Sequence, residues 1–433
     1  MVAVLVVAMV LDTSLVRIYS ISSNIQTLSN IRIGLFLAIA IAYVTGQYLL
    51  LEFVKKKSRE IRTKKQLHLK IIHRTVTIVQ YLLTALLVVI ISEMILTSSY
   101  STLLLAIIVG ISYILAIAML GLLAQRFFSW FKSNRNLVVL LYGLSGAMLA
   151  INATFTIAFV EVILIDTVPY VQSYVGASVT PFIAPGSLAD LLNYPYILTT
   201  VLSFMISWVA TIMILRHYSS KLRQVRYGVI LSLPLLYFLL QFLPPFQSII
   251  TALPQSESVF FIYTVIFTFS KPIGGILFGI AFWVIARTLG HTSIVRDYMI
   301  ISAYGLVLLF ISNQAVLLSN SFYPPFGVVT VSLIALSSYL LLLGVYSSAI
   351  SVSEDSKLRQ SIREFTLSET RLLDSIGTAH MEQEIQKRVL ALTRKNQRSL
   401  EEETGIQSSL TDDDVKDYLE QVIEEVKKER RKP

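Results

Sequence analysis

Long apolar runs dominate this sequence. Nine stretches of 20 to 29 residues contain at most one charged side chain each, namely 34–53, 76–96, 103–123, 137–165, 196–215, 227–246, 259–286, 299–318 and 328–350. About 20 consecutive apolar residues are enough for an α-helix to cross a bilayer. Backbone amides inside the bilayer need hydrogen bonds within the segment, so each run is expected to be helical. The sequence therefore predicts an all-α, polytopic transmembrane helical bundle.

The distribution of charge divides the chain into a bundle and a tail. Only 15% of the 433 residues are charged, against roughly 25% in soluble domains. Residues 1–350 hold 9 acidic and 21 basic residues, whereas residues 351–433 hold 18 acidic and 15 basic ones. We expect residues 33–350 to form the bundle and residues 351–433 to form a charged helical tail.

Residues 1–32 are expected to form an N-terminal apolar segment and an outer linker. The run Met1–Val10 is too short to cross a bilayer by itself, and Asp12 follows it. Two interpretations remain open: a half-length helix, or a marginal tenth span that ends near Leu15.

Lysines and arginines collect on alternate loops. Four loops on one side hold 18 of them, in the ranges 54–75, 126–135, 216–226 and 287–296. The loops on the other side hold none, and only Arg17 and Arg32 precede the first span there. Positively charged short loops stay on the cytoplasmic side. We therefore expect a multi-pass protein of the cell membrane with a cytoplasmic C-terminus.

The same loops account for the net charge of +9, so we predict no nucleic-acid partner. Besides the lipid bilayer itself, the basic loop 54–74 is expected to meet one of two partners. It would bind anionic lipid headgroups, or it would dock acidic segments of the tail. In a third interpretation its charge only sets the topology.

One span carries the candidate intramembrane site. Lys271 lies near the middle of the run 259–286, beside Pro272 and just before Gly274 and Gly275. A lysine at mid-depth costs about 2.5–3.5 kcal/mol on insertion scales, and proline kinks or breaks a helix. This pattern is typical of the unwound centre of a transporter helix. In the alternative interpretation, Lys271 extends toward the outer headgroups.

Four further residues belong to the candidate site: Glu93, Glu161, Asn313 and Gln314. The two glutamates lie near the outer ends of their spans, where either would be a carboxylate partner for Lys271. The two amides are expected to form hydrogen bonds between helices, or to line a cavity that opens outward. Gly275 and Gly279 are expected to serve helix packing.

Several kinds of chemistry are excluded. The chain has no cysteine, which rules out disulfides, thiolate metal sites and cysteine nucleophiles. None of the five histidines lies inside an apolar span, so a haem site or a catalytic base is not expected there. We predict no catalytic residues, no metal and no cofactor, and therefore a protein that is not an enzyme.

The tail contains two amphipathic stretches. Leu372 and Ile376 begin the first, in which Gly377 is expected to break or bend the helix. Residues 411–414, Thr-Asp-Asp-Asp, are expected to cap the start of the second. Each stretch has one apolar face, which predicts coiled-coil pairing, self-association or a protein partner.

The tail segment LLDSIGTAHMEQEIQKRVLALTRKN follows nine spans in a cysteine-free chain. In this layout the chain resembles uncharacterised multi-pass membrane proteins of ammonia-oxidising archaea. The resemblance implies an archaeal membrane protein and implies no activity.

Two functional hypotheses follow. In the first, the protein is a non-catalytic membrane sensor or scaffold that signals through its cytoplasmic helical tail. Here the outer loop 166–195 would be a lid, and the last span would run without a break through residues 345–356. In the second, the protein transports a small anionic or polar solute by means of a broken helix at Lys271–Pro272.

Overall fold

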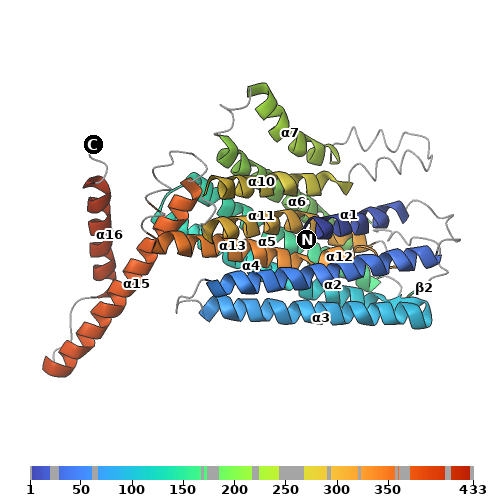
Figure 1. Cartoon of the computed structure of the whole chain (residues 1–433), viewed down its shortest axis with the longest axis horizontal. Helices are drawn as coiled ribbons and strands as arrows, with labels where there is room; N and C mark the ends of the chain where they lie inside the picture. The colour runs from blue at the N-terminus through green and yellow to red at the C-terminus, as the bar shows by residue number, and fades with distance from the viewer. Residues whose placement is uncertain are drawn as a thin grey trace.

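The computed structural model describes residues 2–19, 29–60, 67–166, 170–172, 185–216, 224–242, 268–289, 294–319, 323–355, 359, 371–404 and 411–429. Within these ranges the chain is almost entirely helical (Figure 1). The helices of the bundle are α1 (Val2–Tyr19), α2 (Ser29–Glu60), α3 (Leu67–Thr97), α4 (Thr102–Ser133), α5 (Leu137–Asp166), α6 (Leu188–Leu215), α7 (Gln224–Leu240), α10 (Ser270–Thr288), α11 (Ile294–Ser312), the 3-10 helix η3 (Ala315–Ser319), α12 (Val328–Ser332) and α13 (Ile334–Glu354). The tail contains α15 (Arg371–Thr404) and α16 (Asp412–Glu429). Two short strands, β1 (Ser99–Ser101) and β2 (Tyr170–Gln172), pair antiparallel.

Eight helical segments in the described part of the chain are long and apolar enough to cross a membrane. Six are the single helices α2, α3, α4, α5, α6 and α10, and the other two join α11 with η3 and α12 with α13. This confirms the all-α fold and indicates a multi-pass membrane protein. The count of nine is not reached, because the expected span 227–246 corresponds to the shorter apolar helix α7, and residues 243–246 lie outside the described part.

The N-terminal helix α1 is a short apolar helix that packs against the bundle. Leu5 lies against Gly46, in the middle of α2. Asp12 is fully buried and accepts hydrogen bonds from the backbone amides of Gly327 (2.8 Å) and Thr330 (3.0 Å). These amides belong to the first turn of α12, whose donors have no partner within the helix. The carboxylate therefore caps α12 from another segment of the chain, which favours the half-length interpretation.

Helices α12 and α13, the last segment of the bundle, form the core of the bundle. The most apolar stretch of Val328–Glu354 is completely buried by the other helices. Small residues make this packing close: Gly305 of α11 lies against the backbone of Leu341, and Gly344 of α13 lies against the backbone of Tyr298 and Ser302. Small residues let membrane helices approach in this way.

Glycines also allow α10 and α11 to pack closely. A side chain at Gly275 would overlap Phe310, and one at Gly279 would overlap the carbonyl of Ala303. This confirms the prediction that the glycine pair serves helix packing.

The tail begins differently from the prediction. Helix α13 ends at Glu354 and Asp355 is extended, so the expected unbroken helix through residues 345–356 is wrong at Asp355, and residue 356 lies outside the described part of the chain. The expected break at Gly377 is also wrong. Helix α15 is continuous there, because the missing side chain at Gly377 makes room for Val352 of α13.

The cap of α16 was predicted correctly. The Thr411 hydroxyl accepts from the amide of Asp414 (3.3 Å), and the Asp414 carboxylate accepts from the amide of Thr411 (2.9 Å). This reciprocal pair is the arrangement of a capping box. The Thr411 hydroxyl also donates to the Asp414 carboxylate (2.6 Å), and this hydrogen bond, together with the one from the Thr411 amide, lowers the pKa of the Asp414 carboxyl.

Candidate functional site

Lys271 lies in the first turn of α10, which begins at Ser270. Residues 259–267, the first part of the expected span, lie outside the described part of the chain, so the expected break at Lys271–Pro272 stays a prediction. Pro272 also falls in this first turn, where a proline is tolerated because the amide it lacks has no helical partner. Gly274 lies against the ring of Phe204 in α6. Lys271 and Pro272 therefore stand at the start of a helix that is regular from Ser270 to Thr288.

The ammonium of Lys271 binds the end of another helix. Its Nζ donates to the backbone carbonyl of Asn313 at 3.1 Å and lies 5.9 Å from the centre of the Tyr196 ring. Asn313 and Gln314 are the two non-helical residues between α11 and η3. The carbonyls at a helix C-terminus lack partners and carry partial negative charge. Lys271 therefore compensates the C-terminal end of α11.

The side chain of Asn313 connects three more helices. Its Nδ2 donates to Asn152 Oδ1 of α5 (2.9 Å), and its Oδ1 accepts from the Tyr113 hydroxyl of α4 (3.0 Å). Asn152 Nδ2 in turn donates to Thr200 Oγ1 (2.8 Å) and Thr199 Oγ1 (3.2 Å) of α6. All five side chains are buried. The prediction of interhelical hydrogen bonding is confirmed for Asn313, and these side chains satisfy one another's polar groups, as a buried network requires.

The remaining candidate residues do not join this network. The amide of Gln314 donates to the carbonyl of Ile311 (3.1 Å). The carboxylate of Glu93 accepts from the amide of Ser101 in β1 (3.0 Å). Glu161 of α5 faces Gly110 of α4. Within the described residues no ion pair joins Lys271 to either glutamate.

A second polar region lies where the tail meets the bundle. Four apolar side chains at the start of α15 are buried: Leu372, Leu373, Ile376 and Ala379. The amide of Gln383 donates to the hydroxyls of Ser129 (2.9 Å) and Ser133 (3.1 Å) at the end of α4, and Asn136 donates to Ser375 (2.5 Å). We call these contacts the α15 docking surface.

Aromatic rings extend the α15 docking surface into the bundle. The ring of His380 lies edge-on to Tyr346 of α13, with 5.7 Å between the centres, and the Tyr346 ring stacks on Trp130 of α4 at 6.3 Å. The guanidinium of Arg126 lies 5.1 Å from the centre of the Tyr346 ring, a distance at which cation and ring attract. The start of α15 is thus held by α4, α5 and α13 together.

A cavity of about 600 Å³ opens between α2 and α3. It is lined by Tyr48, Leu51, Glu52, Lys55, Lys56, His73, Arg74, Thr77, Ile78 and Tyr81. A deeper cavity of about 310 Å³ is lined by Val44, Thr45, Gln47, Tyr48, Leu51, Tyr81 and Thr84. The two cavities share Tyr48, Leu51 and Tyr81 and therefore adjoin each other, and we call them together the α2/α3 groove. Neither cavity includes Lys271 or its hydrogen-bond partners.

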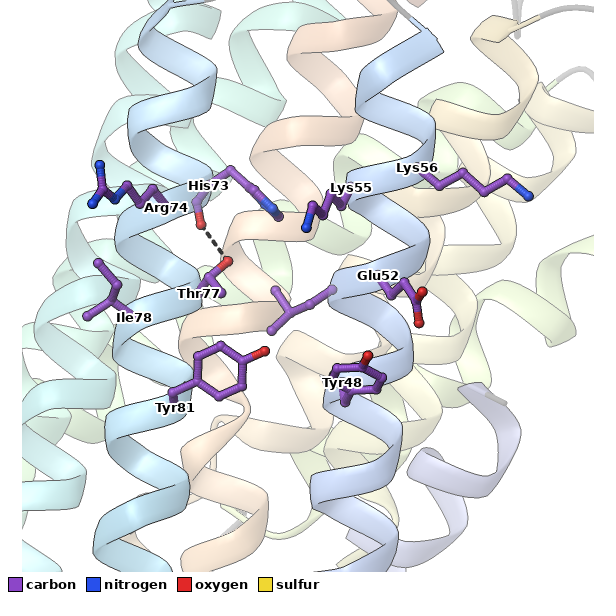
Figure 2. Close-up of a pocket in the computed structure, with 10 residues that line it drawn as sticks. Tyr48, Glu52, Lys55, Lys56, His73, Arg74, Thr77, Ile78 and Tyr81 are labelled. Carbon is purple, nitrogen blue, oxygen red and sulfur yellow. Dashed lines mark hydrogen bonds between the residues drawn. The ribbon is translucent and has the colours of Figure 1, made fainter.

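Figure 2 shows the α2/α3 groove with the ribbon of α13 behind it. Lys55 of α2 and His73 of α3 point toward each other across the opening, whereas Lys56 and Arg74 point outward at its two sides. Farther along the same two helices, Tyr48 of α2 and Tyr81 of α3 face the groove. At its base, His73 Nδ1 lies 2.9 Å from the Tyr339 hydroxyl of α13, and Gln80 Nε2 donates to the carbonyl of Ser332 (3.4 Å).

Sequence reasoning did not single out this groove, although a signal was present. On α3, His73, Thr77 and Tyr81 follow one another at intervals of four residues and therefore share one helix face. Lys55, Lys56 and Arg74 were assigned to the basic loop 54–74, for which anionic lipid headgroups were one expected partner, and not to a groove between two helices. The relation of the two helices to each other is absent from the local pattern.

Comparison of the chain with protein-family models, with curated proteins and with solved structures gives no match. The resemblance to archaeal membrane proteins stays a prediction. The functional argument therefore depends on the geometry of the chain itself.

Proposed function

We propose that the protein is a non-catalytic membrane sensor or scaffold whose cytoplasmic tail responds to the packing of the bundle. The observation that carries this proposal is the α15 docking surface. Helix α15 contacts α4, α5 and α13 through buried side chains. Any change in how these three helices pack therefore changes the α15 docking surface.

The interior of the bundle offers a route for such a change. The helices α4 and α5 that carry the docking surface also carry Tyr113 and Asn152 of the Asn313 network. The core helix α13 packs against α11 along its length and contacts α15 at its end. Buried networks and close-packed helices have discrete arrangements. A change in the arrangement of the Asn313 network is therefore expected to alter the packing at the α15 docking surface.

The alternative, transport of a small anionic or polar solute at Lys271, has less support. The Lys271 ammonium already binds the α11 terminus, at the end of α10 away from the tail (Figure 1). A substrate would have to displace this hydrogen bond.

The orientation proposed for the protein is a nine-span bundle in the cell membrane with the tail in the cytoplasm. The charge asymmetry supports it, and so does the position of the basic helix ends. Lys57 at the end of α2 forms a 2.8 Å ion pair with Asp297 at the start of α11, and these ends lie at the same end of the bundle as α15 (Figure 1). Positive charge on one side of the membrane marks the cytoplasmic side.

The test measures whether a change in the Asn313 network alters the contacts at the α15 docking surface. Cysteines at Ser133 and Gln383, introduced into this cysteine-free chain, report docking through cross-linking by a short bis-maleimide. Asn152→Leu removes the centre of the Asn313 network. We expect it to change the cross-linking rate.

Thr154→Leu is the matched control, because Thr154 lies on the same helix and is exposed. It should leave the cross-linking rate unchanged. A rate that is the same in Asn152→Leu and in the unmodified bundle would contradict the sensor role.

A further inference from the structure

We propose that the α2/α3 groove binds one anionic lipid molecule, with its phosphate at the basic opening and a hydrocarbon chain along the deeper part. This inference is independent of the role proposed for α15. It is carried by the charges at the opening, by the length and lining of the groove, and by the groove's position on the surface of the bundle.

The charges at the opening suit an anion. The lining includes the cations Lys55, Lys56 and Arg74 and a single carboxylate, Glu52. Among the described residues none of these three cations forms an ion pair or a hydrogen bond with another side chain. Lys57, the next residue, is instead paired with Asp297. Lys55 therefore points across the opening, where it would bind a phosphate group by a charge-assisted hydrogen bond, and Lys56 and Arg74 lie at its two sides, where their positive charge would attract the phosphate (Figure 2).

The deeper part suits a hydrocarbon chain. From Lys56 to Val44 the groove follows α2 over about 18 Å at 1.5 Å per residue, close to half of a ~30 Å hydrocarbon core. Its lining there is mainly apolar and aromatic, with Val44, Leu51, Tyr48 and Tyr81. A small soluble anion would occupy only the opening, whereas a lipid fills both parts.

The groove is reachable from the bilayer. Tyr48, Ile78 and Tyr81 are each more than half exposed at the bundle surface. The base behind them is closed by the hydrogen bonds from His73 to Tyr339 and from Gln80 to Ser332. A lipid is therefore able to enter from the side, in the leaflet next to the tail, without any helix moving apart.

The test measures lipid retained by the full chain purified in detergent that contains phosphatidylglycerol and phosphatidylcholine in equal amounts, by native mass spectrometry. The unmodified protein is expected to retain phosphatidylglycerol in preference. Each of Lys55→Gln, Lys56→Gln and Arg74→Gln should weaken this retention about fivefold, the factor for about 1 kcal/mol per charge. Lys132→Gln and Arg135→Gln, at the same end of the bundle, are controls and should have no effect.

A second pair of variants tests the hydrocarbon chain. Thr45→Trp fills the deeper cavity from an exposed position and should reduce retention, whereas Ile41→Trp, one turn away on α2 and outside the cavity lining, should not. An unchanged thermal midpoint verifies that each variant is folded. Equal retention of the two lipids would overturn the proposal. So would full displacement of phosphatidylglycerol by inorganic phosphate together with no effect of Thr45→Trp, because the ligand would then be a free phosphate.

Discussion

At the scale of single residues, two buried or half-buried charges each complete the end of a helix in another part of the chain. Lys271 donates to the end of α11, and Asp12 accepts from the start of α12. Both helix ends belong to the irregular stretch between α11 and α13. Charged groups at these positions complement the partial charges of the helix termini.

The role of Lys271 leads to a prediction about stability. Lys271→Met keeps a long flexible stem but leaves the Asn313 carbonyl without its donor, so we expect the free energy of unfolding to fall by about 1–3 kcal/mol. Lys271→Arg keeps a charged donor and should lose less. Thermal unfolding of the purified variants measures both effects.

Lys132→Met is the control, because Lys132 is exposed at the end of α4. Its stability should stay within about 0.5 kcal/mol of the unmodified protein. If Lys271→Met matched this control, the ammonium would not support the α11 terminus.

At the scale of elements, the core helix α13 depends on close approach to α11. The backbone of Tyr298 and Ser302 occupies the space that a side chain at Gly344 would need. Backbone atoms of a packed helix cannot move aside as the end of a flexible side chain does. The glycine therefore sets the distance between the two helices.

Gly344→Leu should consequently be strongly destabilising. Overpacking of a core typically costs about 1–3 kcal/mol and sometimes more, and we expect the upper end or beyond because backbone is displaced. Gly121→Leu on α4 should be tolerated, since no atom lies within 4 Å of the position of the new Cβ. The yield and the thermal midpoint of the monodisperse protein are the measurements, and similar values for the two variants would contradict this account of the α11–α13 contact.

At the scale of the whole molecule, basic helix ends gather at the end of the bundle that carries α15, and the strand pair β1–β2 lies at the other end (Figure 1). This arrangement agrees with the charge asymmetry of the loops. It leads to a prediction about which residues are accessible from each side of the membrane.

Single cysteines test that topology, because the chain has none of its own. Ser187→Cys, just before α6, should react with an impermeant maleimide in whole cells. Ser399→Cys, exposed on α15, should react only after the membrane is permeabilised. The reverse pattern of labelling would invert the proposed orientation.

The tail shows where local patterns were sufficient and where they failed. The capping box of α16 was predictable, because Thr411 and Asp414 are three residues apart and need only each other. The apolar face at Leu372 and Ile376 was also visible, but it was expected to be covered by the other tail helix, by a second copy of the chain or by a protein partner. The bundle itself covers it, and Gly377 fits there because Val352 occupies the space beside it.

The sequence by itself determined that the chain is helical and crosses the membrane several times, because the length of each apolar run and the need to satisfy backbone hydrogen bonds in lipid are local properties. Only the tertiary structure decided the contact between Lys271 and the end of α11, the capping of α12 by Asp12, the docking of α15 on the bundle and the α2/α3 groove. Each of these depends on which helices become neighbours. Inside a bilayer that choice follows from small residues and polar contacts matched between distant segments, and no single stretch of sequence contains both sides of such a match.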